Sequence, residues 1–459
     1  MSEPTVMNSR PESSASKAGG FFVTADGKNL AFTFMLVSSL FLLWGFCNGM
    51  IDTMDKHFQD ELHLTLAQSA NVQWAHYLGY FLMALPAGWL ATKLGYKGGI
   101  IAGLLMVAIG GFWFIPATHI AKFWAFLVGV CFIAAGLTFL ETIANPYTTV
   151  LGAPKFAASR INLAQSCNGI GWILGPIAGS MFFYSKDASG KSTGAETLWI
   201  PYVTVAVVVI VLAVIFFFAE VPDVKTQDAY HLDDPKADVS RSIWTHPHFV
   251  MAVAAQFFYV AAQAGIFGFF INYMTSEVPA IPSAWQSHLS AGWLETGANG
   301  AVHLSDKFGS ILASVGFGWF LLGRFTGAAL LNRISAHKML GIYGVANIAM
   351  CLLIFCKLGW VSVACVFLSY FFMSIMFPTI FALGIHGLGV RAKKASSFIV
   401  MAIMGGALLP KLMGHVADRH GMSHGFIVPA FCFVVVAAYG FLWPKLSRAE
   451  SANVKLSGH

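Results

Sequence analysis

Two carboxylates, Asp52 and Glu141, stand in stretches of the sequence that are otherwise apolar enough to cross a membrane. An acid at the centre of a membrane helix costs roughly 2.5 to 3.5 kcal/mol, so such a residue usually faces a polar interior, a partner or a pathway. An apolar site favours the protonated form of a carboxyl group, which allows it to bind and release a proton near working pH. The two acids are therefore candidates for moving protons across a membrane.

The two acids are predicted to lie at different depths. Asp52 comes late in the first apolar segment, which runs outward if the amino terminus is inside, and Glu141 comes late in the fourth, which runs inward. With a rise of about 1.5 Å per residue, Asp52 falls in the outer half of the membrane and Glu141 at or below its midplane. Such a stagger suits a proton relay. The alternative is that each acid only hydrogen-bonds its neighbours, and that Asp52 ends its helix beside Asp55, Lys56 and His57.

Amide side chains recur on two further segments. Gln165 and Asn168 share a face of the fifth segment, and Gln256, Tyr259 and Gln263 share a face of the seventh. A sugar presents a ring of hydroxyl groups, and amides supply both donors and acceptors, so two such faces are suited to gripping a sugar between them. The alternative is that these polar residues only join neighbouring helices by hydrogen bonds.

Membrane helices are the elements that would position these residues. Hydrophobic residues make up 57% of the 459 and charged residues only 10%, which excludes a soluble globular domain. Hydrocarbon offers no partner for a bare peptide group, so each apolar run must be helical. The sequence therefore predicts an all-α membrane protein with twelve transmembrane helices. Their predicted ranges are 31–53, 69–92, 98–117, 123–147, 160–184, 199–219, 247–275, 308–332, 338–357, 360–386, 395–417 and 425–443.

The twelve helices divide into two bundles of six. The polar stretch 220–246 separates an amino-terminal bundle at 30–219 from a carboxy-terminal bundle at 247–444, and tails occupy 1–29 and 445–459. With both termini cytoplasmic, most of the 27 Lys and Arg residues fall on the inner side, as the positive-inside rule requires. The net charge of +6 then reflects inner loops and not nucleic-acid binding. The first tail lacks the apolar core of a signal peptide and is predicted to be disordered.

Other features of the sequence indicate packing. No HExxH, GxSxG or P-loop lysine pattern occurs, and the seven cysteines show no metal-like CxxC spacing, so we expect no enzyme, metal site or cofactor. The glycines from Gly169 to Gly179 lie inside an apolar run with no preceding strand, which favours close helix packing. Trp44 and Trp172 are expected to pack in the core or against lipid, the alternative being a stack on a sugar ring. The outer segment 276–307 is either a lid or a passive insertion.

Six strings of the sequence carry a family resemblance: Leu140–Gly152 (LETIANPYTTVLG), Arg160–Asn168 (RINLAQSCN), Ala255–Gln263 (AQFFYVAAQ), Gly323–Gly327 (GRFTG), Phe372–Ile385 (FMSIMFPTIFALGI) and Ser396–Gly406 (SSFIVMAIMGG). They closely resemble the fucose-proton symporter family of the major facilitator superfamily, which also includes glucose and galactose carriers. The resemblance extends from about Phe41 to Phe441. It implies a major facilitator fold of two six-helix bundles, alternating access and proton-coupled sugar import.

The resemblance also implies roles for individual residues. Asp52 and Glu141 match the protonatable pair of the family, and Glu141 is also expected to contact the sugar. Phe377, another expected sugar contact, stands where the family pattern has a tyrosine, and Gly49 stands where it has an asparagine. Each departure removes a partner for a sugar hydroxyl, so the choice among fucose, galactose, glucose and related hexoses stays open. The remaining polar matches line the sugar cavity of the family: Asn48, Gln165, Asn168, Gln256, Tyr259 and Gln263.

We therefore expect a monomer of the bacterial cytoplasmic (plasma) membrane that imports a monosaccharide together with a proton. Its partners are the sugar, protons and the lipid bilayer, with no nucleic acid. Two alternatives are kept. One is a uniporter or a sodium-coupled sugar carrier of the same fold, and the other is a membrane sugar receptor that binds without transport.

Overall fold

The computed structural model describes residues 20–24, 27–153, 157–184, 197–221, 242–297, 300–331, 333–388 and 392–447. This part of the chain is largely helical, with one small antiparallel sheet that pairs β1 (Leu294–Thr296) with β2 (Val302–Leu304). Ten of its helices are long and apolar enough to cross a membrane. Most of the predicted linker and of both predicted tails lies outside the described residues.

The first bundle contains six of the predicted passes. Within its long third helix, Gly95 takes a φ of 69°, a left-handed conformation that glycine adopts without steric cost, and this residue turns the chain between two passes. The helices of the bundle are α1 (Ala31–Glu61), α2 (Leu66–Ser69), α3 (Asn71–Ile120), α4 (Phe123–Val150), α5 (Ala157–Phe182) and α7 (Trp199–Phe218). The ten apolar helices include only the second part of α3, from Lys93 to Ile120. The first part of α3 and the helix α5 add two further passes, which gives the predicted twelve.

The second bundle follows the same plan, with more interruptions. Its elements are η2 (Ile243–Thr245), α8 (Pro247–Gly268), α9 (Phe270–Ser276), α10 (Ser283–Gln286), η3 (Ala291–Trp293), α11 (Asp306–Leu331), α12 (Ala336–Phe355), α13 (Trp360–Met373), α14 (Met376–Ile385), α15 (Ala392–Met401), η5 (Ala402–Met404), α16 (Gly405–His420), α17 (Met422–Gly425) and α18 (Ile427–Leu446).

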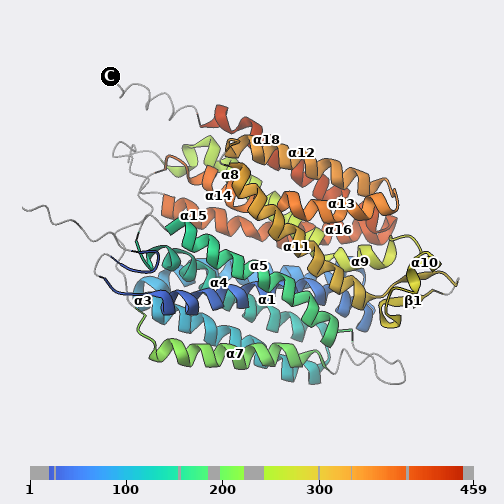
Figure 1. Cartoon of the computed structure of the whole chain (residues 1–459), viewed down its shortest axis with the longest axis horizontal. Helices are drawn as coiled ribbons and strands as arrows, with labels where there is room; N and C mark the ends of the chain where they lie inside the picture. Colours follow the sequence, from blue (N-terminus) through green and yellow to red (C-terminus); the bar gives the residue numbers. More distant parts are fainter. Residues whose placement is uncertain are drawn as a thin grey trace, which may run out of the picture.

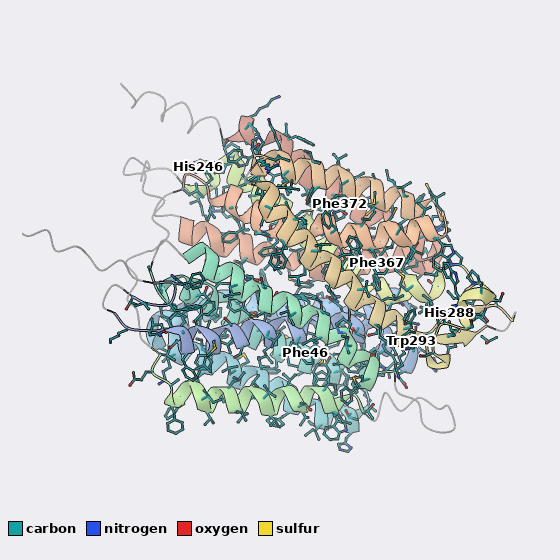
Figure 2. The ribbon with its side chains drawn as sticks, viewed as in Figure 1. Phe46, His246, His288, Trp293, Phe367 and Phe372 are labelled. Carbon is teal, nitrogen blue, oxygen red and sulfur yellow. The ribbon has the colours of Figure 1, made fainter. Side chains whose placement is uncertain are left out.

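The two bundles lie side by side, and each has a hydrophobic core of its own (Figure 1). The β1–β2 hairpin and α10 project from one end of the molecule, which we name the hairpin end, and α18, the last described helix, ends at the opposite end, the terminal end (Figure 1). Figure 2 shows His288 and Trp293 at the hairpin end and His246 toward the terminal end. Part of the predicted disordered tail is held in place, because Arg160 Nη1 donates a hydrogen bond to the carbonyl of Phe21 (2.9 Å).

Glycines bring α1 and α5 into backbone contact. A Cβ atom at Gly171 would lie 2.2 Å from the carbonyl oxygen of Leu42, and one at Gly175 would lie 2.7 Å from the carbonyl carbon of Gly49. Only residues without a side chain let two helices approach this closely, so the predicted role of these glycines in packing is confirmed. Gly49 is itself constrained, since a Cβ there would lie 2.8 Å from the carbonyl oxygen of Trp172. An asparagine therefore does not fit at this position.

The first helix is longer than predicted. The sequence suggested an end near residue 53, but α1 continues to Glu61 with Asp55, His57 and Phe58 buried. These side chains pack against the bundle, and their burial extends the helix past the polar residues that suggested its end. The alternative that Asp52 ends its helix is therefore wrong.

The tenth predicted pass is broken into α13 and α14. The break falls at Ser374 and Ile375, just before Pro378. A proline has no N–H to donate and its ring clashes with the carbonyl four residues earlier, which is that of Ser374. The chain is therefore irregular near the middle of this pass.

The segment predicted as a lid or an insertion is folded onto the second bundle. Trp293 stacks on Phe308 of α11 with ring centroids 4.6 Å apart. Trp285 of α10 lies 5.3 Å from the ring of Trp360, at the start of α13. The segment thus covers the ends of α11 and α13.

Candidate functional site

The site lies where the two bundles meet. Helices α1 and α5 of the first bundle contact α8 and α11 of the second. Trp172 of α5 crosses this interface, with its ring centroid 4.8 Å from that of Phe317 and 5.8 Å from that of Phe267. The expectation that Trp172 packs in the core is confirmed, and its partners belong to the opposite bundle.

Hydrogen bonds join the bundles at the hairpin end. The carboxylate of Asp418, on α16, accepts from the backbone N–H groups of Leu66 (2.8 Å) and Ala67 (3.0 Å) at the start of α2. The hydroxyl of Ser310, on α11, donates to the carbonyl of Pro176 on α5 (2.6 Å). We name this set of contacts the hairpin-end seal.

Side chains of α1 extend the hairpin-end seal. Lys56 Nζ lies 2.6 Å from a carboxylate oxygen of Asp60 on the same helix and 3.6 Å from one of Asp306 on α11. One turn further along, the amide of Asn272 on α9 donates to Gln59 Oε1. The interface is therefore closed at this end by polar groups from α1, α2, α5, α9, α11 and α16.

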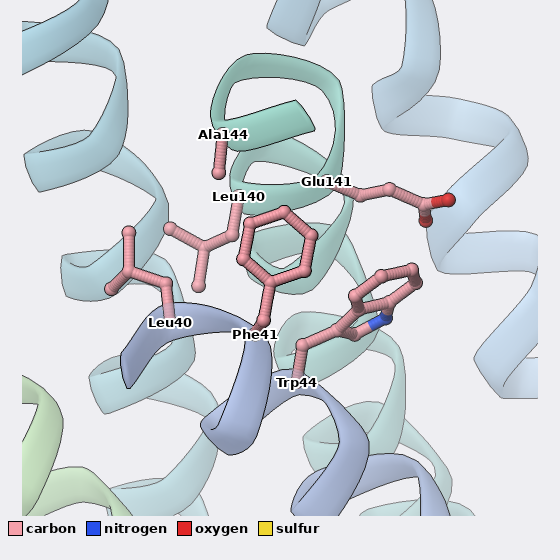
Figure 3. Close-up of a pocket in the computed structure, with 6 residues that line it drawn as sticks. All are labelled: Leu40, Phe41, Trp44, Leu140, Glu141 and Ala144. Atoms are coloured by element: carbon pink, nitrogen blue, oxygen red, sulfur yellow. The ribbon is translucent and has the colours of Figure 1, made fainter. Parts of the chain in front are cut away.

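Glu141 lies further from the hairpin end, beside a small pocket between α1 and α4. Figure 3 shows its carboxylate extending past the ring of Trp44 and away from the apolar side chains of the pocket. Glu141 is partly exposed, and no hydrogen bond reaches its carboxylate from the described part of the chain. Trp44 Nε1 donates to the hydroxyl of Tyr80 on α3 (2.6 Å) and so fixes the indole beside the acid. The other lining residues are Leu40, Phe41, Leu140 and Ala144.

Amides connect Glu141 to α5. The side chain of Asn145 donates to the main-chain carbonyl of Glu141 (3.0 Å), and Gln165 Nε2 donates to Asn145 Oδ1 (3.0 Å). Gln165 is partly exposed, whereas Asn168 is buried and donates to the carbonyl of Phe41 on α1 (3.2 Å). The structure thus brings Gln165 next to the Glu141 segment and gives Asn168 a contact between two helices.

Asp52 lies closer to the hairpin end than Glu141. The rise along α1 from Trp44, which lies beside Glu141, to Asp52 is about 12 Å. Asp52 is only 8% exposed, and its Oδ1 accepts a hydrogen bond from Gln73 Nε2 on α3 (2.8 Å). Asn48, one turn earlier, is also buried, and its Oδ1 has no partner in the described chain.

The second bundle contributes one fully buried amide and a tyrosine. Gln256 is 0% exposed, and neither its Oε1 nor its Nε2 has a hydrogen-bond partner among the described residues. Tyr259 is also 0% exposed and donates its hydroxyl to the carbonyl of Met373 (3.0 Å), at the break between α13 and α14. Phe377 lies beside it, with ring centroids 6.4 Å apart. Gln263, on the same face of α8, is partly exposed.

Sequence reasoning missed four residues of this region. Gln73 and Asn145 contact the two acids or their backbone, and Asp55 is buried beside Asp52. Arg324 lies in α11 with its guanidinium 5.2 Å from the ring of Phe320 and with no partner for its Nε in the described chain. A charge inside a membrane is costly for Asp55 and Arg324 as well as for Asp52. The argument that singled out Asp52 in the sequence therefore also applies to these two residues.

Comparisons with known proteins place the chain among membrane transporters. The sequence pattern of the Major Facilitator Superfamily matches residues 32–390. The chain is 33% identical over 423 residues to a glucose/galactose transporter of Brucella abortus, covering 92% of the chain and 96% of that transporter. It is 34% identical over 440 residues to the L-fucose-proton symporter of Escherichia coli, covering 92% of the chain and 94% of that protein.

Solved structures agree with this placement. The crystal structure of a variant of the Escherichia coli fucose:proton symporter matches with a TM-score of 0.64 at 33% identity, covering 91% of this chain and 99% of that one. A D-xylose-proton symporter matches with a TM-score of 0.67, covering 90% and 97% of the two chains, but at 11% identity the match shows only a shared fold.

Proposed function

Because the chain belongs to the major facilitator superfamily, a family of multi-pass membrane transporters, we propose that it imports a monosaccharide together with a proton by alternating access. The names of two relatives support a monosaccharide and a proton as the two substrates: one is a glucose/galactose transporter and the other an L-fucose-proton symporter. The observation that carries the proposal is the placement of the two acids. Glu141 extends from a pocket, and its carboxylate has no hydrogen-bond partner in the described part of the chain, while Asp52 is buried toward the hairpin-end seal.

In this proposal the sugar binds between the bundles beside Glu141. Trp44 offers the flat face of its indole, whose N–H is already bonded to Tyr80, for stacking on the apolar face of a sugar ring. Glu141 and the amides of Asn48 and Gln165 then meet the sugar hydroxyls from the first bundle, with Asn168 holding α5 against α1.

The second bundle would meet the other side of the sugar. The amide of Gln256 has donors and an acceptor without partners among the residues that the structure describes, and Gln263 lies on the same face of α8. The hydroxyl of Tyr259 already donates a hydrogen bond to the carbonyl of Met373. Tyr259 would therefore contact the sugar through its aromatic ring, as Phe377 would. This gives the second bundle a wall of two aromatic rings and two amides.

The proposed orientation rests on the charge distribution. The terminal end carries the basic side chains of Lys93, Lys97 and Lys338, so the positive-inside rule assigns this end to the cytoplasm and the hairpin end to the outside. We further propose that the protein is a monomer of the bacterial cytoplasmic membrane and that both termini lie inside. In this proposal the six-helix bundles at 30–219 and 247–444 move relative to each other about the central site. The net positive charge reflects basic cytoplasmic loops that orient the protein in the membrane, and not nucleic-acid binding.

The membrane potential is large enough to drive accumulation. Moving one proton inward gains roughly 2.3 kcal/mol per 100 mV. At about 1.4 kcal/mol for each tenfold change, this supports an inside-to-outside sugar ratio of roughly fortyfold.

The test is sugar accumulation by the purified protein in liposomes that hold an imposed proton gradient. L-Fucose, D-galactose, D-glucose and D-mannose are offered separately. We expect one or a few of these sugars to accumulate and a protonophore to abolish the accumulation. Accumulation that needs sodium, equilibration without accumulation, or binding without any transport would each contradict the proposal.

A further inference from the structure

The side-chain amide of Gln73 hydrogen-bonds two buried acids, Asp52 and Asp55. The proposed function gives a role to Asp52 but not to Asp55. Gln73 Nε2 donates to Asp52 Oδ1 at 2.8 Å and to Asp55 Oδ2 at 3.2 Å. An amide nitrogen carries two hydrogens, so one is available for each carboxylate. Gln73 and Asp55 are each 1% exposed and Asp52 is 8% exposed, so all three side chains are shielded from water. We name these three residues the Asp–Gln–Asp site.

Each acid keeps one oxygen unpaired. Asp52 Oδ2 and Asp55 Oδ1 are buried without a hydrogen-bond partner among the described residues. The nearest basic side chain on the same helix, Lys56, is already engaged by Asp60 and Asp306. A buried ionised carboxylate without a partner is costly, and two of them on one amide also repel each other. The arrangement is therefore suited to hold at least one proton.

The groups that face the site from other helices do not supply a positive charge. They are phenols, which are neutral at physiological pH. The imidazole of His76 lies against the rings of Tyr77 and Tyr80, and that of His57, on α1 itself, lies against Phe183. The phenols near enough to sense the charge of one or both carboxylates are Tyr77 on α3, Tyr184 after α5, Tyr202 on α7 and Tyr370 on α13.

The opposite bundle covers the site. A Cβ atom at Gly268, the last residue of α8, would lie 2.7 Å from Asp55 Oδ2 and 3.1 Å from Gln73 Nε2. The backbone of the second bundle thus rests directly on the hydrogen-bonded pair. The cover belongs to the conformation in which the hairpin-end seal is formed, so separation of the bundles at that end would expose both acids.

We propose that Asp55 is a second proton-binding carboxyl group, and that Gln73 holds Asp52 and Asp55 so that they share a proton taken up before the second bundle closes over them. This inference rests on the proposed function, because it refines how the coupled proton is bound. Asp55 binds the proton together with Asp52, and Gln73 is a positioning residue that keeps the two carboxylates on one amide.

The test is the pH dependence of sugar-driven proton uptake in liposomes. Asp55→Asn removes a negative neighbour of Asp52, so the remaining acid holds its proton less tightly. The pH at which uptake falls to half its maximum should then move down by about one unit, a tenfold change in proton concentration. Gln73→Leu removes the donor that stabilises both ionised carboxylates, so this variant should move the same pH upward.

Two controls separate this proton-binding role from a structural one. Asp55→Glu keeps a carboxyl group, although its extra methylene must fit under Gly268, and should shift the profile less than Asp55→Asn does. Glu295→Gln removes an exposed acid of the hairpin and should leave the profile unchanged. If Asp55→Asn does not fold, the upward shift in Gln73→Leu carries the test. Wild-type profiles in the folded variants would overturn the inference, whereas a wild-type protein that moves no protons with sugar would overturn the proposed function.

Discussion

Replacing Gly268 by alanine should disfavour the conformation in which the hairpin-end seal is formed. The new Cβ would lie 2.7 Å from Asp55 Oδ2 and 3.1 Å from Gln73 Nε2, both closer than ordinary van der Waals contact. The two partners are each 1% exposed and have little room to move. Overpacking of this kind costs about 1 to 3 kcal/mol.

The cost applies only when the bundles meet, because Gly268 and its two neighbours belong to opposite bundles. At about 1.4 kcal/mol for each tenfold change, the ratio of sealed to open hairpin ends should fall roughly 5- to 150-fold. Gly265→Ala is a matched control on the same helix. Its Cβ would lie 2.8 Å from the sulfur of the flexible Met413 side chain and 4.0 Å from Pro410 Cα, both within the second bundle.

The assay is a distance measurement between two spin labels across the hairpin end, in a chain whose native cysteines are replaced. Lys122 and Glu295 are exposed and lie on different bundles, so they are suitable labelling positions. Gly268→Ala should show a larger population at long distance, and Gly265→Ala should match the parent protein. An unchanged distribution in Gly268→Ala would refute the view that Gly268 closes directly on Asp55 and Gln73.

Three further substitutions test individual contacts. Gln256→Leu should raise the melting temperature, because it removes a buried amide that has no hydrogen-bond partner within the described ranges, and it should weaken sugar binding in calorimetry; unchanged affinity would exclude Gln256 as a sugar contact. Tyr259→Phe leaves the Met373 carbonyl without its donor and should cost about 1 to 3 kcal/mol of stability, so an unchanged melting temperature would contradict that hydrogen bond. Asp418→Ala removes the acceptor for two N–H groups of α2 and should weaken the seal by about 0.5 to 2 kcal/mol, lengthening the spin-label distances; an unaltered distribution would show that this contact does not hold the bundles.

The architecture was predictable because the bilayer leaves few choices. Apolar runs of spanning length must be helices, and the polar stretch after Glu220 divides them six and six. The packing role of Gly171 and Gly175 was also predictable, since small residues inside an apolar helix allow backbones to approach. These features depend on composition and local spacing, which a sequence displays directly.

Contacts between distant segments were not predictable in the same way. Asp55 looked like a residue beyond the end of a helix, and its burial depends on Gln73 of α3 and Gly268 of α8. The folding of Trp285 and Trp293 onto the second bundle likewise depends on partners elsewhere in the chain. The site residues named from the sequence are consistent in type with a polar cavity, but their roles stay predictions.

The most direct test of the proposed mechanism is sugar-induced alkalinisation outside liposomes that contain either the wild-type protein or Glu141→Gln. In the wild type, addition of the transported sugar should draw protons inward and raise the external pH. In Glu141→Gln the signal should disappear, while exchange of labelled sugar across the membrane continues. Sugar transport without any proton signal in the wild type, or an undiminished signal in Glu141→Gln, would contradict the role that we assign to Glu141.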